Sequence, residues 1–184
     1  MSLEALLVID VQKDYFRGGK MELAGSIEAA ERICTLVSLF RKKGSPVIHV
    51  QHISVRPGAS FFAPGTEGVE FHERVLPMEG EKVFRKNYPN AFRETGLEDY
   101  CREMGIGRVV IVGMMTHMCI DATVRAAFDL GFECILLGDC CATRDLTWGG
   151  RTVMAGDVQA SFLASVNGTF AKVLDSEGFI ASRI

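Results

Sequence analysis

The sequence lacks an excess of positive charge and lacks long hydrophobic runs. It has 20 lysines and arginines against 23 aspartates and glutamates, a net charge of −3. A nucleic-acid-binding domain usually carries a basic stripe, so we expect no nucleic-acid partner. No segment approaches the roughly 20 apolar residues of a membrane span, so we expect no membrane association. The first residues have no basic stretch before their short apolar run, as an export signal would, and we expect a cytoplasmic protein.

The sequence also lacks the features of a disulfide-rich or dithiol redox protein. Its six cysteines include no Cys-x-x-Cys motif, and they are expected to be reduced. Cys34, Cys101 and Cys134 lie in apolar periodic segments, where thiols usually pack in the core. Cys140 and Cys141 are sequence neighbours, which rarely form a relaxed disulfide. A redox role for either of them remains an alternative to hydrolysis.

No internal repeat, linker or low-complexity block divides the chain, and we expect one domain over residues 1–184. Apolar runs predict strands, and helical spacing of apolar residues predicts helices. The predicted strands are 5–9, 46–50, 82–85, 108–112, 133–137 and 171–174, and the predicted helices are 26–43, 97–104, 119–130 and 150–167. Strands that alternate with helices predict an α/β fold, with a parallel sheet between two helical layers.

Residues 54–80 are rich in glycine, proline and aromatic side chains and show no clear periodicity. A loop of this length inside a compact domain is usually functional. We therefore expect this loop to line a pocket.

Three chemically active residues follow predicted strands. Asp10 ends the strand at 5–9, Lys86 follows 82–85, and Cys119 comes after 108–112 at the start of a predicted helix. Loops at the carboxyl ends of parallel strands meet at one edge of the sheet, so the three side chains are expected to converge. A helix N-terminus favours thiolate and is expected to lower the pKa of Cys119. The carboxylate of Asp10 is suited to take the thiol proton, and the Lys86 ammonium to stabilise negative charge.

Three blocks of the sequence resemble the isochorismatase-like cysteine hydrolases. Residues 7–16 (LVIDVQKDYF) are similar to the family's strand, aspartate, glutamine and aromatic opening. Residues 86–92 (KNYPNAF) look like its lysine block, and residues 113–127 (GMMTHMCIDATVRAA) like its cysteine block. The blocks occur in order and span most of the chain.

The resemblance implies a single three-layer α/β/α domain with a doubly wound, mostly parallel six-stranded sheet. It also implies that Asp10, Lys86 and Cys119 form a catalytic triad. A cis peptide between Met114 and Met115 is expected from the same resemblance. The backbone amides of Met115 and Cys119 would then form an oxyanion hole.

The expected reaction is hydrolysis of an amide or carbamoyl C–N bond in a small molecule, through a thioester on Cys119. One alternative is the vinyl-ether cleavage of isochorismatases, and another is a catalytically silent binding member of the same fold. The resemblance further suggests a homodimer or homotetramer.

No metal and no other cofactor is expected. His49 and His52 are three apart on a predicted strand and point to opposite faces. The family's metal-dependent nicotinamidases carry Asp-x-His near this strand end, whereas this chain has Val50-Gln51-His52. Retention of a carboxylate at position 50 would have favoured zinc.

Four residues near the triad in sequence are expected to bind the substrate. Phe16, Phe62 and Tyr88 offer aromatic walls for a small planar molecule, and His117 lies two residues before Cys119. Ordinary packing of Phe16 and Phe62, and capping of the helix by His117, are the alternatives. Arg144 is expected to form a structural or interface ion pair, with contact to a substrate carboxylate as the alternative.

Overall fold

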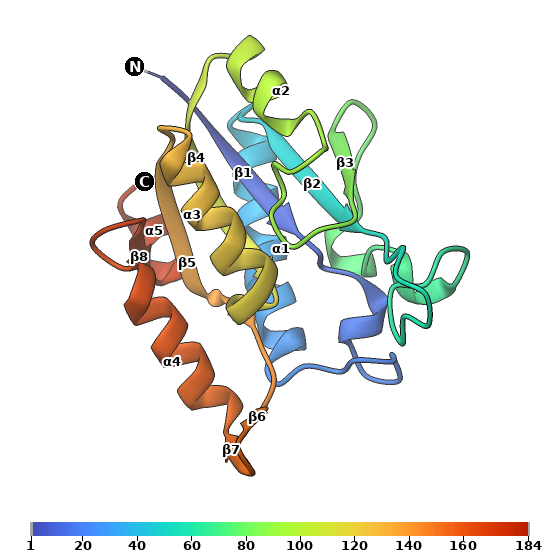
Figure 1. The fold of residues 1–184 in the computed structure, drawn as a ribbon. Helices are drawn as coiled ribbons and strands as arrows, with labels where there is room; N and C mark the ends of the chain where they lie inside the picture. Colours follow the sequence, from blue (N-terminus) through green and yellow to red (C-terminus); the bar gives the residue numbers. More distant parts are fainter. Residues whose placement is uncertain (1, 184) are drawn as a thin grey trace.

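A six-stranded parallel sheet forms the centre of the molecule (Figure 1). The structure is a computed structural model, and it describes residues 2–183. The sheet order is β3-β2-β1-β4-β5-β8, with each neighbouring pair parallel. The strands are β1 (Leu3–Ile9), β2 (Val47–His52), β3 (Lys82–Lys86), β4 (Ile106–Met114), β5 (Glu133–Ala142) and β8 (Lys172–Leu174). The order reverses direction at β1 and β4, as a doubly wound sheet requires.

Helices cover both faces of this sheet (Figure 1). On one face lie α1 (Ser26–Lys42) and α5 (Ser176–Ala181), and on the other lie α2 (Leu97–Glu103), α3 (Asp121–Asp129) and α4 (Ala155–Val166). Alternate residues of β1 enter opposite cores: Leu6 and Val8 face α1, whereas Leu7 and Ile9 face α2 and α3. This double burial explains why β1 is apolar without interruption. The predicted three-layer α/β/α fold is confirmed.

The main difference from the predicted elements lies between β5 and α4. Residues 150–154, expected to begin a helix, belong to a small antiparallel hairpin of β6 (Leu146–Trp148) and β7 (Arg151–Val153). Its two turn residues, Gly149 and Gly150, have φ of 56° and 77°. Only glycine adopts such values freely, and two of them in succession form the usual turn of a two-residue hairpin. The hairpin projects below the sheet in Figure 1.

The carboxyl ends of β1 and β4 approach each other unusually closely. Gly113 has φ of 127°, and a Cβ atom there would lie 2.0 Å from the carbonyl oxygen of Ile9. Asp10, the residue that follows β1, has φ of 52°. Aspartate tolerates this left-handed conformation better than most residues, yet it remains strained. Strained backbone of this kind concentrates at functional sites.

The loop between β2 and β3 extends beside the edge of the sheet, on the right of Figure 1. It contains two short 3₁₀ turns, Glu67–Val69 and Glu73–Val75. Among residues 2–183, we find no helix with the length and apolar character needed to span a membrane.

Candidate active site

The side chains of Asp10, Lys86 and Cys119 meet at the carboxyl edge of the sheet. The Lys86 ammonium Nζ lies 2.7 Å from Asp10 Oδ2 and 3.2 Å from Cys119 Sγ. All three side chains are buried, none more than 5% exposed. The convergence predicted from the strand ends is confirmed.

Three different elements deliver these side chains. Asp10 follows the last residue of β1, and its positive φ turns the chain at that point. Lys86 is the last residue of β3, in register with His52 at the end of β2. Cys119 lies inside a π-helical turn, Thr116–Ile120, which joins β4 to α3. Such π-helical turns occur frequently at functional sites.

The charges of this cluster favour a thiol in the resting site. Burial, and after it the Asp10 carboxylate, raise the pKa of Cys119, and the opposing effect of Lys86 is smaller. The expected lowering of the thiol pKa is therefore wrong for the resting site, because a second anion beside Asp10 in a buried place is unfavourable. Burial lowers the pKa of Lys86, but the negative charge of Asp10, together with the contacts and hydrogen bonds to Cys119 and Asp10, outweighs burial and raises it. Lys86 is thus an ammonium.

The proton of Cys119 has a short route that keeps the net charge of the site constant. A carboxylate oxygen of Asp10 and the sulfur of Cys119 lie within 4.8 Å. Asp10 Oδ1 is buried and has no hydrogen-bond partner within residues 2–183. Transfer of the thiol proton to Asp10 creates a thiolate and a neutral carboxyl group beside the Lys86 ammonium. The buried site then holds one positive and one negative charge, as it does before the transfer.

A fourth side chain, His52, completes the cluster. Its Nδ1 lies 2.9 Å from Lys86 Nζ. Burial, and then the positive charge of Lys86, lower the pKa of His52 to about 4, so the ring is neutral at neutral pH. The sequence analysis treats His52 only as a candidate metal ligand. Its position at the end of β2, next to β3, is the signal that would have placed it beside Lys86.

A metal ion does not fit among these residues while Lys86 is present. One ligand atom each of Asp10, His52 and Cys119 lies within 4.8 Å of the others. The Lys86 ammonium makes a hydrogen bond to each of the three side chains and so occupies the cationic position between them. His49 is engaged elsewhere, with its Nε2 3.0 Å from Glu81 Oε2. The two histidines therefore serve different partners, as their spacing predicts.

A cavity of about 310 Å³ opens beside Cys119. This size suits a small molecule. The cavity is lined by Tyr15, His52, Ser54, residues 56–61, Asn87, Pro89, Met115, Met118 and Cys119. Residues 54–61 belong to the long loop that was expected to line a pocket, and that expectation is confirmed.

The four predicted substrate-binding residues do not line this cavity. Phe62 is buried behind it, with its ring centroid 4.6 Å from that of Tyr15. Tyr88 lies under the Arg93 guanidinium at 3.5 Å, and His117 Nδ1 lies 2.6 Å from Thr143 Oγ1. Nearness in sequence to the triad did not fix the direction of their side chains. Tyr15 and Phe61 provide the aromatic walls instead.

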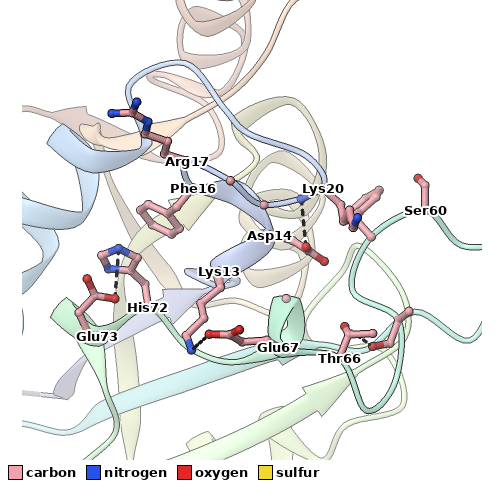
Figure 2. Close-up of a pocket in the computed structure, with 15 residues that line it drawn as sticks. Lys13, Asp14, Phe16, Arg17, Lys20, Ser60, Thr66, Glu67, His72 and Glu73 are labelled. Atoms are coloured by element: carbon pink, nitrogen blue, oxygen red, sulfur yellow. Dashed lines mark hydrogen bonds and ion pairs between the residues drawn. The ribbon is translucent and has the colours of Figure 1, made fainter.

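Phe16, the fourth, lines a separate cavity of about 670 Å³ (Figure 2). Its ring stacks on His72 with centroids 3.8 Å apart. Ser60 and Phe61 line both cavities. Asp14 connects the loops around them, since its carboxylate accepts hydrogen bonds from the amides of Phe62 (2.6 Å) and Lys20 (3.1 Å).

The residues of the expected oxyanion hole lie at the Cys119 cavity. Met115 and Cys119 both line it. The peptide bond between Met114 and Met115 is cis. Oxyanion binding by the amides of Met115 and Cys119 stays a prediction.

Residues 4–177 match the family model of the isochorismatase domain. The chain belongs to the isochorismatase family. The Bacillus subtilis isochorismatase family protein YddQ is 48% identical over 176 residues, covering 96% of this chain and 98% of YddQ. A crystal structure from Oleispira antarctica has a TM-score of 0.94 and 44% identity, and the match covers 98% of this chain and 97% of that one.

A more distant relative of this isochorismatase-family hydrolase has a named reaction. The maleamate amidohydrolase of Pseudomonas putida is 31% identical over 157 residues, covering 76% of this chain and 72% of the relative. The family therefore includes an amidohydrolase.

Proposed function

We propose that this chain hydrolyses an amide or carbamoyl C–N bond in a small molecule, with Cys119 as nucleophile. The observation that carries the proposal is a buried cluster of Asp10, Lys86 and Cys119 that opens onto a cavity of about 310 Å³. A thiol beside a carboxylate and an ammonium is a nucleophile with its base already in place. The amidohydrolase among the relatives supports this bond over the vinyl ether.

In the first half of the reaction, Asp10 takes the thiol proton and Cys119 Sγ attacks the carbonyl carbon. The amides of Met115 and Cys119 donate hydrogen bonds to the oxyanion. Asp10 then delivers the proton to the leaving nitrogen, the C–N bond breaks, and a thioester forms. Lys86 remains an ammonium throughout and offsets the negative charge.

In the second half, Asp10 takes a proton from water as that water attacks the thioester. The C–S bond breaks and the carboxylic or carbamic acid product leaves. Asp10 returns its proton to the departing Cys119 sulfur, which restores both the thiol and the Asp10 carboxylate. Each half returns the site to the same net charge, which is the condition that the buried cluster imposes.

The test is release of ammonia or amine from a panel of small primary amides, carbamates and ureas. We expect a subset to turn over, and intact-protein mass spectrometry after rapid quenching to show an acyl group on Cys119. Cys119→Ala should remove both signals. Cys34→Ala, which alters a half-buried thiol on α1, should retain both. Turnover that persists in Cys119→Ala would contradict the proposal and favour cleavage without the cysteine.

A further inference from the structure

We propose that His52 is a positioning residue of this site, which holds the Lys86 ammonium in place between Asp10 and Cys119. The inference rests on the proposed function only for its activity readout, because the state of Cys119 can be measured without a substrate. His52 acts through Lys86.

The hydrogen bonds of Lys86 carry the argument. An ammonium has three N–H donors. Lys86 Nζ has three acceptors, at 2.7 Å in Asp10, 2.9 Å in His52 and 3.2 Å in Cys119. The side chain is 1% exposed. Rotation of the ammonium therefore breaks a buried hydrogen bond to a charged donor, which is costly. With His52 removed, one of the three buried acceptors is lost, and Asp10 and Cys119 alone hold the ammonium.

His52 is itself held from behind by Gln12, a buried residue two positions after Asp10. Gln12 Nε2 donates to the carbonyl oxygen of His52 at 2.9 Å, and the His52 amide donates to Gln12 Oε1 at 2.8 Å. The side chain of Gln12 is fully buried. These two hydrogen bonds join the end of β2 to the segment after β1 that carries Asp10. The imidazole is therefore positioned by its backbone.

The contact also fixes the proton of the imidazole. Because Lys86 donates to Nδ1, the ring carries its proton on Nε2 and is neutral. The titratable groups that face Lys86 are Asp10, which follows β1, and Cys119 in the π-helical turn. Arg56 in the loop acts on His52, and Tyr15 in the 3₁₀ turn after β1 lies near Cys119 and Asp10. Of the three acceptors of Lys86, Asp10 carries the negative charge, whereas His52 and the Cys119 thiol are neutral in the resting site.

Three substitutions distinguish the loss of a hydrogen-bond acceptor for Lys86 from the loss of side-chain volume. In His52→Asn, the side-chain oxygen lies near the position of Nδ1 and keeps the bond to Lys86. His52→Gln places its amide near Nε2, and His52→Leu keeps the bulk without an acceptor. His72→Leu, in the second cavity, controls for loss of a buried histidine away from Lys86.

The first measurement is the pH dependence of Cys119 alkylation by iodoacetamide, read by peptide mass spectrometry. A displaced ammonium stabilises the thiolate less, so we expect the midpoint to rise by about one pH unit in His52→Leu and His52→Gln. His52→Asn and His72→Leu should match the wild type. If His52→Leu does not fold, the comparison of Asn with Gln decides the question.

The second measurement is kcat/KM on a substrate found by the amide panel. We expect a loss of about 10- to 100-fold in His52→Leu, with recovery to within about fivefold in His52→Asn. Equal midpoints in the wild type, the Gln variant and the Leu variant would overturn the inference, as would an Asn variant indistinguishable from Gln. Failure of the whole amide panel, with the alkylation result intact, would count against the proposed function alone.

Discussion

At the scale of the residue, Asp10 has two oxygens with different surroundings. Oδ2 pairs with Lys86 at 2.7 Å, whereas Oδ1 is buried and has no partner among the described residues. A buried acceptor without a donor is unusual in a native protein and costs free energy. An incoming proton from Cys119 would relieve that cost, which makes Oδ1 the natural acceptor in the first step.

Asp10→Asn is expected to reduce kcat by about 10²- to 10⁴-fold, because the amide cannot accept the thiol proton. The same substitution leaves Lys86 without its buried counter-ion, which costs about 3–5 kcal/mol of stability. Ammonia release and urea unfolding should therefore be measured on the same preparation. A folded Asp10→Asn protein with near-normal turnover would rule out Asp10 as the base.

Arg56 lines the Cys119 cavity. Apart from the cluster itself, it is the one charged side chain among the described residues that line this cavity. Its charge lowers the pKa of the nearby His52, after burial and Lys86. We expect amides that carry a carboxylate to be better substrates than neutral amides of the same size.

Arg56→Gln should raise KM for the carboxylate-bearing amide about two- to fivefold and leave KM for its neutral analogue unchanged, since one solvent-exposed ion pair is lost. Arg17→Gln, in the second cavity, is the matched control. Equal effects on both substrates would show that Arg56 shapes the cavity rather than selecting charge.

Strand ends could be predicted from the sequence, but side-chain directions could not. Asp10, Lys86 and Cys119 can be identified because each follows a predicted strand, and a parallel sheet brings such positions together. Phe16 and Tyr88 lie on the expected loops but turn to His72 and Arg93. The direction of an aromatic ring in a loop depends on tertiary contacts that no local pattern encodes.

At the scale of the element, the hairpin of β6 and β7 shows how a local signal is missed. Gly149-Gly150 between Leu-Thr-Trp and Arg-Thr-Val is a typical hairpin turn sequence. The predicted helix at 150–167 includes the residues of β7, whereas the helix begins only at Ala155. Tertiary information was not needed here, because the two glycines already indicated the turn.

Gly113 in β4 is expected to tolerate no side chain. In Gly113→Ala the Cβ atom would lie 2.0 Å from backbone Ile9 O, and φ is 127°. We expect a loss of more than about 3 kcal/mol of unfolding free energy or an insoluble protein.

Gly107→Ala, in the same strand, is the control for Gly113→Ala. Its Cβ atom would meet the side chain of Ser2 rather than backbone of a paired strand, and its φ lies outside the left-handed region. Urea unfolding of both variants should show a much smaller loss for Gly107→Ala. Equal losses would mean that glycine is needed in β4 for a reason other than the approach to Ile9.

The two histidines of β2 predict how stability depends on pH. Burial lowers the pKa of His49, and burial with Lys86 lowers that of His52 to about 4. Below about pH 6.5 the unfolded chain binds protons on these rings, whereas the folded chain does not. The stabilisation that these two neutral rings give the folded state is therefore fully present above about pH 6.5. The free energy of unfolding falls as the pH falls from there toward 4.

Urea unfolding at pH 7.5, 6 and 5 should show this decline, by roughly 1–2 kcal/mol for His52 after allowance for its partial exposure. His52→Asn should flatten the curve in this interval. An unchanged slope in that variant would assign the acid sensitivity to other groups.

At the scale of the whole molecule, the long loop between β2 and β3 is the segment that shapes the Cys119 cavity. The sheet and helices bury their apolar residues in two cores. The loop instead contributes Ser54 and residues 56–61 to the Cys119 cavity. Its excess of glycine, proline and aromatic residues predicted a pocket, but its path over the site depends on anchors such as Asp14.

We predict that the chain forms a homodimer or homotetramer, with a mass of twice or four times 20.2 kDa. The hairpin offers an exposed apolar residue for such contacts, since Trp148 is 88% exposed. Light scattering during size-exclusion chromatography measures the mass directly. Elution as a monomer at micromolar concentration would contradict this expectation.

The buried, protonated thiol of Cys119 has a consequence for resistance to oxidation. Hydrogen peroxide reacts with thiolate, and susceptibility follows thiolate character and exposure. With its pKa raised and its side chain 5% exposed, Cys119 should form sulfenic acid slowly until a substrate draws its proton to Asp10. The same arrangement that keeps the charge constant thus lets the resting enzyme endure oxidative stress that would inactivate a permanent thiolate.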